Sequence, residues 1–423
     1  MKIIYFLLAC LYWISANSQE TLDLNDCISL ALKNNAKIKN NLVETEQSKD
    51  AQKEAFTNLF PKVSAFGSSY ISNKGILETE LIPGMNLSLL KKGIVGGITA
   101  IQPIYAGGQI YNSNRLASAY VDVRDLMLEQ TRDDIRLVTE RYYWQYILLT
   151  KKMETLDMIE HMIASTCKDV EVLVKSGITT TNNLLEVELR KNEIASNKLQ
   201  LKNATKHLKM FLAQHIGFPV DSFIVKGIEY DELVSPIHFK VVHKNSLLNT
   251  VPYQLNHKNL EIAKLQTKIE RGKYMPSVAV GAGYMYHNLL EKDHPFGIVY
   301  ATVSLPISQW WGGKHAINQK RREEVIAQIN MDNTNELLLI QMQQNYDDLE
   351  VAYDQVKISQ RSIDSAYENV RLNTEYFKAG TINLTSLLDS QVLLQQAHNL
   401  YVEKYTEYLI KKSIYKTITS SSN

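Results

Sequence analysis

The side chains that most often perform catalysis or bind metals are scattered along this chain. Its 423 residues include ten histidines and three cysteines, and no His-Glu-x-x-His sequence or closely spaced set of metal ligands occurs. His287 and His294 flank an expected loop, where a metal site and two solvated side chains are the alternatives, and solvation is favoured. Gly93–Gly97 resembles a phosphate-binding loop but lacks the Gly-Lys-Ser/Thr ending, so a strand is the better interpretation. The sequence therefore predicts no catalytic site, no cofactor and no metal.

Charge and composition exclude further classes of protein. Lys and Arg number 46 against 45 Asp and Glu, which gives a formal net charge of +1 and no basic excess for binding nucleic acid. Hydrophobic residues make up 45% and charged residues 22%, as expected for a folded chain. The 23 tyrosines against ten phenylalanines suit surfaces that are partly apolar and partly wet.

Residues 1–18 have the pattern of a secretory signal peptide. Lys2 supplies the positive charge, Ile3–Ile14 form the apolar segment, and Ala16-Asn17-Ser18 offers a cleavage site. The alternative is a lipoprotein signal, since Leu7–Cys10 resembles a lipobox, although lipidation of Cys10 would leave a shorter apolar core. No later stretch of about 18 apolar residues occurs, so an exported protein of this sequence would enter a membrane as strands.

An internal repeat organises the rest of the chain. Its landmarks are Pro61, Pro103 and Gly177 in the first half, and Pro276, Pro306 and Gly380 in the second. The second and third pairs are each 203 residues apart, whereas the first pair is 215 apart, so the first copy has a longer loop. We therefore expect a tandem duplication. The expected segments are a first repeat at 19–225, a linker at 226–241, a second repeat at 242–418 and a tail at 419–423.

Each repeat is expected to contain a helix, then two strands, then a long helical hairpin. Of the 18 glycines, 14 lie in the windows 61–108 and 272–313, where apolar residues alternate as in strands. Apolar residues then recur at helical spacing, without proline or glycine over 109–176. The strands are predicted at 62–72, 92–104, 277–287 and 296–308, and the hairpins at 107–215 and 314–416.

Four strands are too few to close a barrel. An open four-stranded sheet in lipid would leave unpaired backbone groups at both edges. Three copies would supply 12 strands, an even number within the bacterial range, and would place six helical hairpins in a ring. The sequence thus favours an α+β membrane protein with long antiparallel coiled-coil hairpins and a barrel shared among subunits.

Several motifs, taken in order, resemble one known family. They are the opening segment Leu24–Asn35, Leu59–Val63, Pro103–Gly108, and the turns Lys175-Ser176-Gly177 and Lys378-Ala379-Gly380. Together with the duplication and the leader, they resemble the outer membrane efflux protein family, the TolC-like proteins of Gram-negative bacteria. The resemblance covers nearly all of the chain after the leader.

The resemblance implies a fold, a location and partners. The fold would be a homotrimeric duct, with a 12-stranded β-barrel in outer membrane lipid and an α-barrel crossing the periplasm. The duct would be the exit of a tripartite efflux pump or type I secretion system. Its partners would be a periplasmic adaptor protein and an inner-membrane transporter of the RND or ABC type, and the cargo would be selected by that transporter. The main alternative is a soluble periplasmic coiled-coil adaptor or scaffold, which would not need detergent for extraction.

The resemblance also assigns roles at the helix turns. In the family, acidic residues near the second-repeat turn narrow a periplasmic gate. Here Asp389 keeps one acid, Ser386 replaces the other, and Glu186 is the first-repeat equivalent of Asp389. Ile382 stands where a basic residue is expected, which predicts a weaker closed state. The alternative for Asp389 is a solvated acid near a helix N-terminus.

The turns themselves are the expected adaptor contact. They comprise the segments 174–183 and 377–386, with Lys175, Gly177, Lys378 and Gly380 at the tips.

Overall fold

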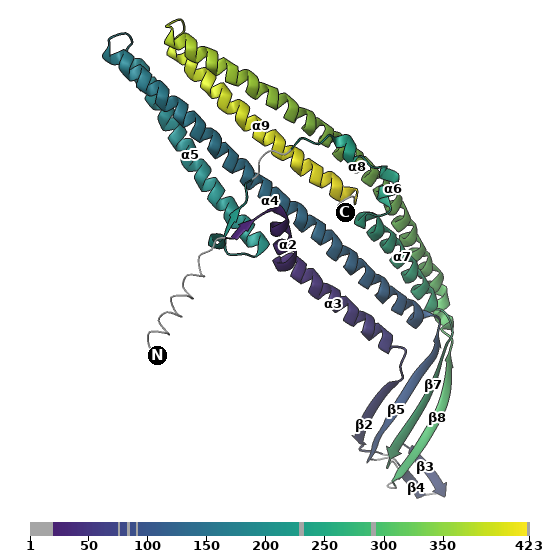
Figure 1. Ribbon diagram of the computed structural model, residues 1–423. Coiled ribbons are helices and arrows are strands. Elements are labelled where there is room, and N and C mark those ends of the chain that lie inside the picture. The colour runs from purple at the N-terminus through teal and green to yellow at the C-terminus, as the bar shows by residue number, and fades with distance from the viewer. Residues whose placement is uncertain are drawn as a thin grey trace, which may run out of the picture. The chain divides into compact units, whose positions relative to one another are not determined.

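The computed structural model describes residues 20–74, 77–82, 85–89, 92–227, 232–288 and 293–420, and the side chains of 75–91 are outside this description. The expected signal peptide and Cys10 also lie outside it. The chain divides into two compact units (Figure 1). The helical unit comprises Met1–Asn41, Leu128–Tyr253 and Asn335–Asn423, and the sheet unit comprises Leu42–Met127 and Gln254–Thr334.

The sheet unit is built on one antiparallel sheet of four strands. The strands are β2 (Lys62–Ile71), β5 (Lys92–Ala106), β7 (Ser277–His287) and β8 (His294–Ser304), and they lie in the order β2-β5-β7-β8. The central pair joins the two repeats, because β5 pairs with β7. Strands β2 and β8 therefore form the two edges of this sheet.

The register of the strands gives the sheet two chemically different faces. Residues directly opposite each other on adjacent strands share a face, and successive residues alternate between faces. The apolar face carries Val63, Ala65, Ile94, Ile98, Ala100, Val278, Val280, Ala282, Tyr284, Val299, Ala301 and Val303. Val299 is 84% exposed on this face. The opposite face is mixed: the hydroxyls of Ser64 and Thr99 are 3.0 Å apart and share a hydrogen bond there, and Phe66, Ile101 and Ile298 lie on the same face.

Three strand predictions need correction. The strand predicted at 296–308 begins earlier, at His294, and ends at Ser304. Pro306 has no N–H to donate to a ladder, and a 3₁₀ turn, η3 (Ile307–Gln309), follows it. Strand β5 continues past the predicted end at 104 to Ala106, through a bulge between Pro103 and Tyr105. Strand β2 ends at Ile71, one residue before the prediction.

The segment between β2 and β5, expected to be a loop, contains a second pair of strands. β3 (Leu77–Ile82) and β4 (Met85–Leu89) pair antiparallel and form a separate two-stranded sheet. The longer insertion in the first repeat is therefore partly a hairpin.

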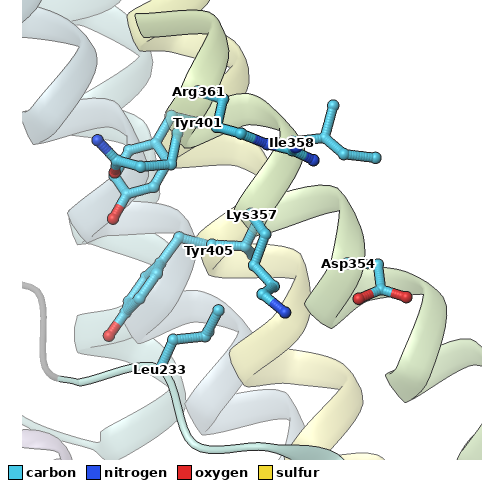
Figure 2. A pocket seen from close by; sticks show the side chains of 9 residues that line it. Leu233, Asp354, Lys357, Ile358, Arg361, Tyr401 and Tyr405 are labelled. Carbon is cyan, nitrogen blue, oxygen red and sulfur yellow. The ribbon is translucent and has the colours of Figure 1, made fainter. Parts of the chain in front are cut away.

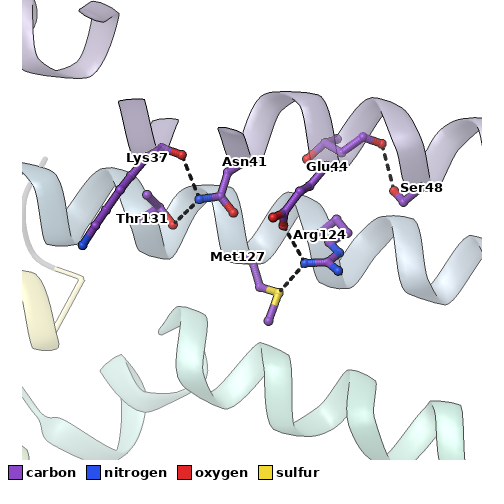
Figure 3. A network of polar contacts seen from close by, with 8 residues as sticks. Lys37, Asn41, Glu44, Ser48, Arg124, Met127 and Thr131 are labelled. Carbon is purple, nitrogen blue, oxygen red and sulfur yellow. Dashed lines mark hydrogen bonds and ion pairs between the residues drawn. The ribbon is translucent and has the colours of Figure 1, made fainter. Parts of the chain in front are cut away.

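Helices complete the sheet unit. They are most of α3 (Ala36–Thr57), most of α7 (Val251–Gly272) and the first parts of α4 (Gln109–Lys175) and α8 (Trp310–Lys378). Ala119 from α4 is buried against Ile262 and Leu265 from α7. On α3 and α4, Arg124 forms an ion pair with Glu44 at 2.8 Å (Figure 3). Helix α8 begins four residues before the predicted hairpin start at 314 and includes Gly312 and Gly313.

The helical unit contains both helical hairpins. The first joins α4 to α5 (Thr181–Ile216), and the second joins α8 to α9 (Leu384–Ile418). The sequence places Leu387, Leu394, Tyr401, Tyr408 and Tyr415 at heptad spacing on α9. Four of these side chains are buried, and Tyr401 is partly buried against the same helices. Near the start of this unit, Asn41 donates hydrogen bonds to Lys37 O and Thr131 Oγ1 (Figure 3).

Shorter elements close the helical unit. α2 (Leu24–Asn34) begins at Asp23, whose side chain accepts from Asp26 N in a capping box. β1 (Glu20–Leu22) pairs in parallel with β6 (Phe223–Val225), and η1 (Val220–Ser222) precedes β6. α6 is His243–Leu247, and η2 is Pro236–Phe239. Cys27 and Cys167 are free, buried and in different apolar clusters, and burial raises the pKa of the Cys27 thiol to about 12.

The predicted linker at 226–241 is held to the long helices by three tyrosine hydroxyls. Tyr143 of α4 donates to Lys226 O at 2.9 Å, and Tyr408 of α9 donates to Val234 O at 2.6 Å. Tyr415 accepts from Val241 N at 3.2 Å. Burial raises the pKa of Tyr143 and Tyr408 to about 12, so both phenols remain protonated donors at neutral pH.

In the part of the chain that the structure describes, no helix combines the length and the apolar character needed to cross a bilayer.

Candidate functional site at the helix turns

The two helix turns are built in the same way from the same kind of sequence. In the first, Gly177 has φ +70°, Ile178 N donates to Leu173 O at 2.9 Å, and Gly177 N donates to Val174 O at 3.0 Å. This is a Schellman motif, which ends a helix with a left-handed residue, usually glycine. The second turn repeats it, with Gly380 at φ +72° and Thr381 N donating to Tyr376 O at 2.9 Å.

The helices that leave the two turns begin differently. Asn383 caps α9, because its side-chain oxygen accepts a hydrogen bond from Ser386 N at 2.9 Å. Thr180 occupies the equivalent position before α5, but its side chain makes no capping hydrogen bond. The third N–H of each helix is therefore satisfied in a different way: Ser386 N donates to the side chain of Asn383, whereas Asn183 N donates to the backbone oxygen of Thr180 at 3.1 Å.

The three predicted gate residues lie within the first six residues of these two helices. Glu186 of α5 is half-buried and accepts a hydrogen bond from Thr385 Oγ1 of α9 at 3.2 Å, which joins the two hairpins. Asp389 and Ser386 are exposed on α9. The structure thus brings Glu186 to the second hairpin through Thr385, a residue that sequence reasoning did not identify.

The position of Asp389 bears on its alternative role. It is the sixth residue of α9, as Glu186 is of α5. The favourable effect of the helix dipole on an acid falls off within the first turn. The helix dipole therefore gives little reason for an acidic residue at position 389.

The predicted adaptor contact residues are exposed. Lys175, Gly177, Lys378 and Gly380 all face solvent, and no atom lies within 4 Å of where a Cβ would sit on either glycine. Between the two turns lies a groove of about 700 Å³, with apolar walls from Val172, Ile178, Phe377 and Ile382. Ile178 is 73% exposed and Val172 is 62% exposed. The sequence analysis included Ile178, Phe377 and Ile382 in the contact segments but did not single out their apolar character, and it left out Val172, although an exposed isoleucine directly after a helix-ending glycine is a readable signal.

Elsewhere the helical unit has a second groove, of about 750 Å³, beside the buried tyrosines of α9. Asp354, Lys357 and Arg361 of α8 line it together with Tyr401 and Tyr405 (Figure 2). These groups are not arranged as a nucleophile with a base. Among the described residues, no group of three or more His, Cys, Asp and Glu side chains is placed to hold a metal ion.

The proline landmarks lie at or near the ends of the strands. Pro61 and Pro276 directly precede β2 and β7. Pro103 lies in β5 beside its bulge, whereas Pro306 follows the end of β8. The second pair of prolines is equivalent in sequence but not in structure.

The whole chain has the fold of solved outer-membrane channels. It is similar to VceC from Vibrio cholerae, with a TM-score of 0.80 and 12% identity over 94% of this chain and 96% of that one. It is likewise similar to the outer-membrane channel OprN, with a TM-score of 0.80 and 13% identity over 94% and 89% of the two chains. For the CmeC outer membrane channel of Campylobacter jejuni, the TM-score is 0.76 and the identity 16%, over 94% and 85%.

The hairpins and the four-stranded sheet therefore define a chain of the outer-membrane channel fold. A search of curated proteins gives no significant match. Residues 255–412 match the family model described as outer membrane efflux protein. The resemblance expected from the sequence motifs is confirmed.

Proposed function

We propose that three copies of this chain assemble into one duct that leads through the outer membrane of a Gram-negative bacterium. The observation that carries this proposal is the four-stranded sheet with edges at β2 and β8. In lipid, unpaired N–H and C=O groups on an open edge each cost several kcal/mol by the usual estimates, roughly 2–7 for an amide. Pairing β8 of one copy with β2 of the next satisfies both edges, and three copies close 12 strands.

The two faces of the sheet support the same arrangement. The face with Val63, Ile98 and Val299 is the more uniformly apolar one and suits lipid. The opposite face mixes the hydroxyls of Ser64 and Thr99 with apolar side chains such as Phe66, and we assign it to the interior of the barrel. A soluble periplasmic scaffold would have no use for so apolar an exposed face. The helical hairpins would then form the periplasmic part of the duct.

The duct serves as the exit of a tripartite efflux pump or a type I secretion system. The efflux family domain over residues 255–412 supports this role. An adaptor protein would bind at the turns, where the groove between Ile178 and Ile382 offers apolar side chains beside exposed Lys175 and Lys378. An inner-membrane transporter of the RND or ABC type would supply the cargo.

The gate is proposed at Asp389. Three copies of an exposed acid at a constriction attract cations and repel anions. Glu186 would support the gate from the neighbouring hairpin, because Thr385 holds its carboxylate. Ser386 replaces a second acid, so the ring carries less negative charge than in the family pattern.

Mass measurement in mild detergent tests the assembly. We expect a trimer as the main species, and only a monomer or a dimer would contradict the proposal. Val299→Arg places a charge on the apolar face and should cost about 2–4 kcal/mol at the bilayer midplane. Thr302→Arg, on the opposite face of the same strand, is the matched control. We expect far less barrel insertion for the first variant than for the second, measured as heat-resistant trimer in membranes.

A further inference from the structure

A pair of stacked imidazoles lies where β7 ends and β8 begins. This is the end of the two strands away from their junctions with the helices. His287 is the last residue of β7, His294 is the first residue of β8, and the two are direct partners in the register. Their ring centroids are 5.1 Å apart, and their planes differ by only 4°. Both lie on the face of the sheet that carries Ser64 and Thr99.

The surroundings hold this pair in place. The ring of Phe296 packs edge-on against both imidazoles, with centroid distances of 5.9 Å to each. Asn288 accepts a hydrogen bond from Ile94 N at 2.7 Å, which fixes the end of β7 against β5. On the other face, the hydroxyl of Tyr286 in β7 donates to Oδ1 of Asp293, the residue before β8, at 2.6 Å. The backbone that carries the two histidines is thus restrained on both sides.

One atom of the pair is chemically unsatisfied. Nδ1 of His287 is buried and has no hydrogen-bond partner among the described residues. Buried polar atoms in native proteins are nearly always paired with protein, water or an ion, so an exception calls for an explanation. In neutral imidazole one nitrogen carries a proton and the other a free lone pair, which is the form that binds metals. His294 is exposed, so solvation accounts for its ring but not for the buried Nδ1 of His287.

We propose that His287 and His294 bind one divalent transition-metal ion per chain, from the imidazole-preferring group of Zn²⁺, Cu²⁺ and Ni²⁺. Two nitrogens about 2.0–2.1 Å from one ion, at a tetrahedral angle, are about 3.4 Å apart. The rings are stacked in this structure, so metal binding requires both imidazoles to rotate out of the stack while the pairing of His287 with His294 in the register is kept. The chain supplies two ligands, so water fills the remaining positions.

Metal binding to the full chain in detergent tests the proposal. After treatment with a chelator, the protein is dialysed against Zn²⁺ alone, and the bound metal is counted per chain. His287→Gln and His294→Gln each remove one ligand, and His207→Gln, an exposed histidine of α5, is the control. Removing a residue that only hydrogen-bonds to a metal ligand weakens metal binding about 10–100-fold. Removing one of the two histidine ligands should therefore weaken Zn²⁺ binding at least about tenfold.

The expected result is saturation at one Zn²⁺ per chain in the unmodified protein and in His207→Gln, with binding weakened in both site variants. With Cu²⁺ as the probe, electron paramagnetic resonance should report two imidazole nitrogens in the unmodified protein and one in either site variant. Circular dichroism and detergent mass should be unchanged in all variants, which separates ligand loss from misfolding. No saturable binding, or binding that either site variant retains, would overturn the proposal. These readouts do not depend on channel activity or on the number of chains in the assembly.

Discussion

In each repeat, a pair of glycines connects the second strand to the long helix that follows. The backbone conformation of this pair differs between the two repeats. In the first repeat, Gly107 and Gly108 have φ values of +60° and +76° and lie before α4 begins. In the second repeat, Gly312 and Gly313 are the third and fourth residues of α8. One pair is therefore a left-handed turn that glycine permits, and the other is ordinary helix in which glycine is unfavourable. The same Gly-Gly motif thus forms a left-handed turn in one repeat and part of a helix in the other.

Contacts made elsewhere in the chain explain the difference. A Cβ on Gly107 would lie 2.2 Å from Gly272 O, because α7 ends against this turn. No atom lies within 4 Å of the equivalent point on Gly312. The end of α7 lies so close to Gly107 that no larger residue fits at this position. At Gly312, by contrast, a larger residue has room.

The largest expected effect comes from Gly107→Ala. A left-handed non-glycine residue costs roughly 1–2 kcal/mol, and the clash with Gly272 O adds roughly 1–3 kcal/mol for overpacking. Thermal unfolding followed by circular dichroism should show a destabilisation of about 2–5 kcal/mol or a failure to fold. A variant as stable as the unmodified protein would mean that the backbone at this turn does not need positive φ.

A second test compares the two acids of the helix turns. Asp389→Asn should reduce the cation preference of the single-channel current in planar bilayers several-fold, because it removes charge from an exposed position. Glu186→Gln should have a smaller effect, since Thr385 already engages that carboxylate. Expression and oligomer mass serve as controls for both variants. Equal effects of the two substitutions would contradict the distinction drawn between the repeats.

The caps of α5 and α9 provide a third test. Asn383→Ala removes the side-chain oxygen that accepts from Ser386 N, and should cost about 0.5–2 kcal/mol. Thr180→Ala should cost only a few tenths, because Thr180 makes no capping hydrogen bond. Protection of the first-turn amides from hydrogen exchange measures the local effect. If Thr180→Ala destabilised its helix as much as Asn383→Ala does, the two N-terminal caps would be equivalent in solution.

The smallest expected effect has the opposite sign. Gly312→Ala should stabilise α8 by up to about 1 kcal/mol, because alanine is the better helix former and the site has room. Gly313→Ala is a poor control for propensity alone, because its Cβ would lie 2.6 Å from the ring of Tyr274. The melting temperature of Gly312→Ala should therefore rise slightly, and a clear fall would place this segment outside regular helix.

Much of the architecture could be predicted because it depends on periodicity along the chain. Alternation placed the four main strands, and the heptad from Leu387 to Tyr415 identified the buried side of α9. The fold class and the family resemblance followed from these patterns and are confirmed. Errors arose where a single residue decides the outcome. Pro306 ends β8 early, although its repeat partner Pro103 lies within a strand.

The remaining features depend on contacts between segments distant in sequence. The conformation at Gly107 is set by the end of α7, and the environment of Glu186 is set by Thr385 on another hairpin. No local pattern encodes either contact. The β3–β4 hairpin differs, since Leu77–Ile82 alternates in sequence and Pro83-Gly84 is a typical turn pair, so that signal was readable but was interpreted as a loop.

The tyrosine attachments of the linker have a consequence for the order in which the chain can fold. N-terminal segments are generally available for folding before C-terminal ones. The carbonyl of Lys226 finds its donor in α4, which has already been made, but Val234 O and Val241 N depend on Tyr408 and Tyr415 of α9. The far end of the linker therefore gains its partners only when α9 is present, because both bonds join residues 174 positions apart in the sequence. Folding of α9 therefore fixes the end of the linker that leads into the second repeat.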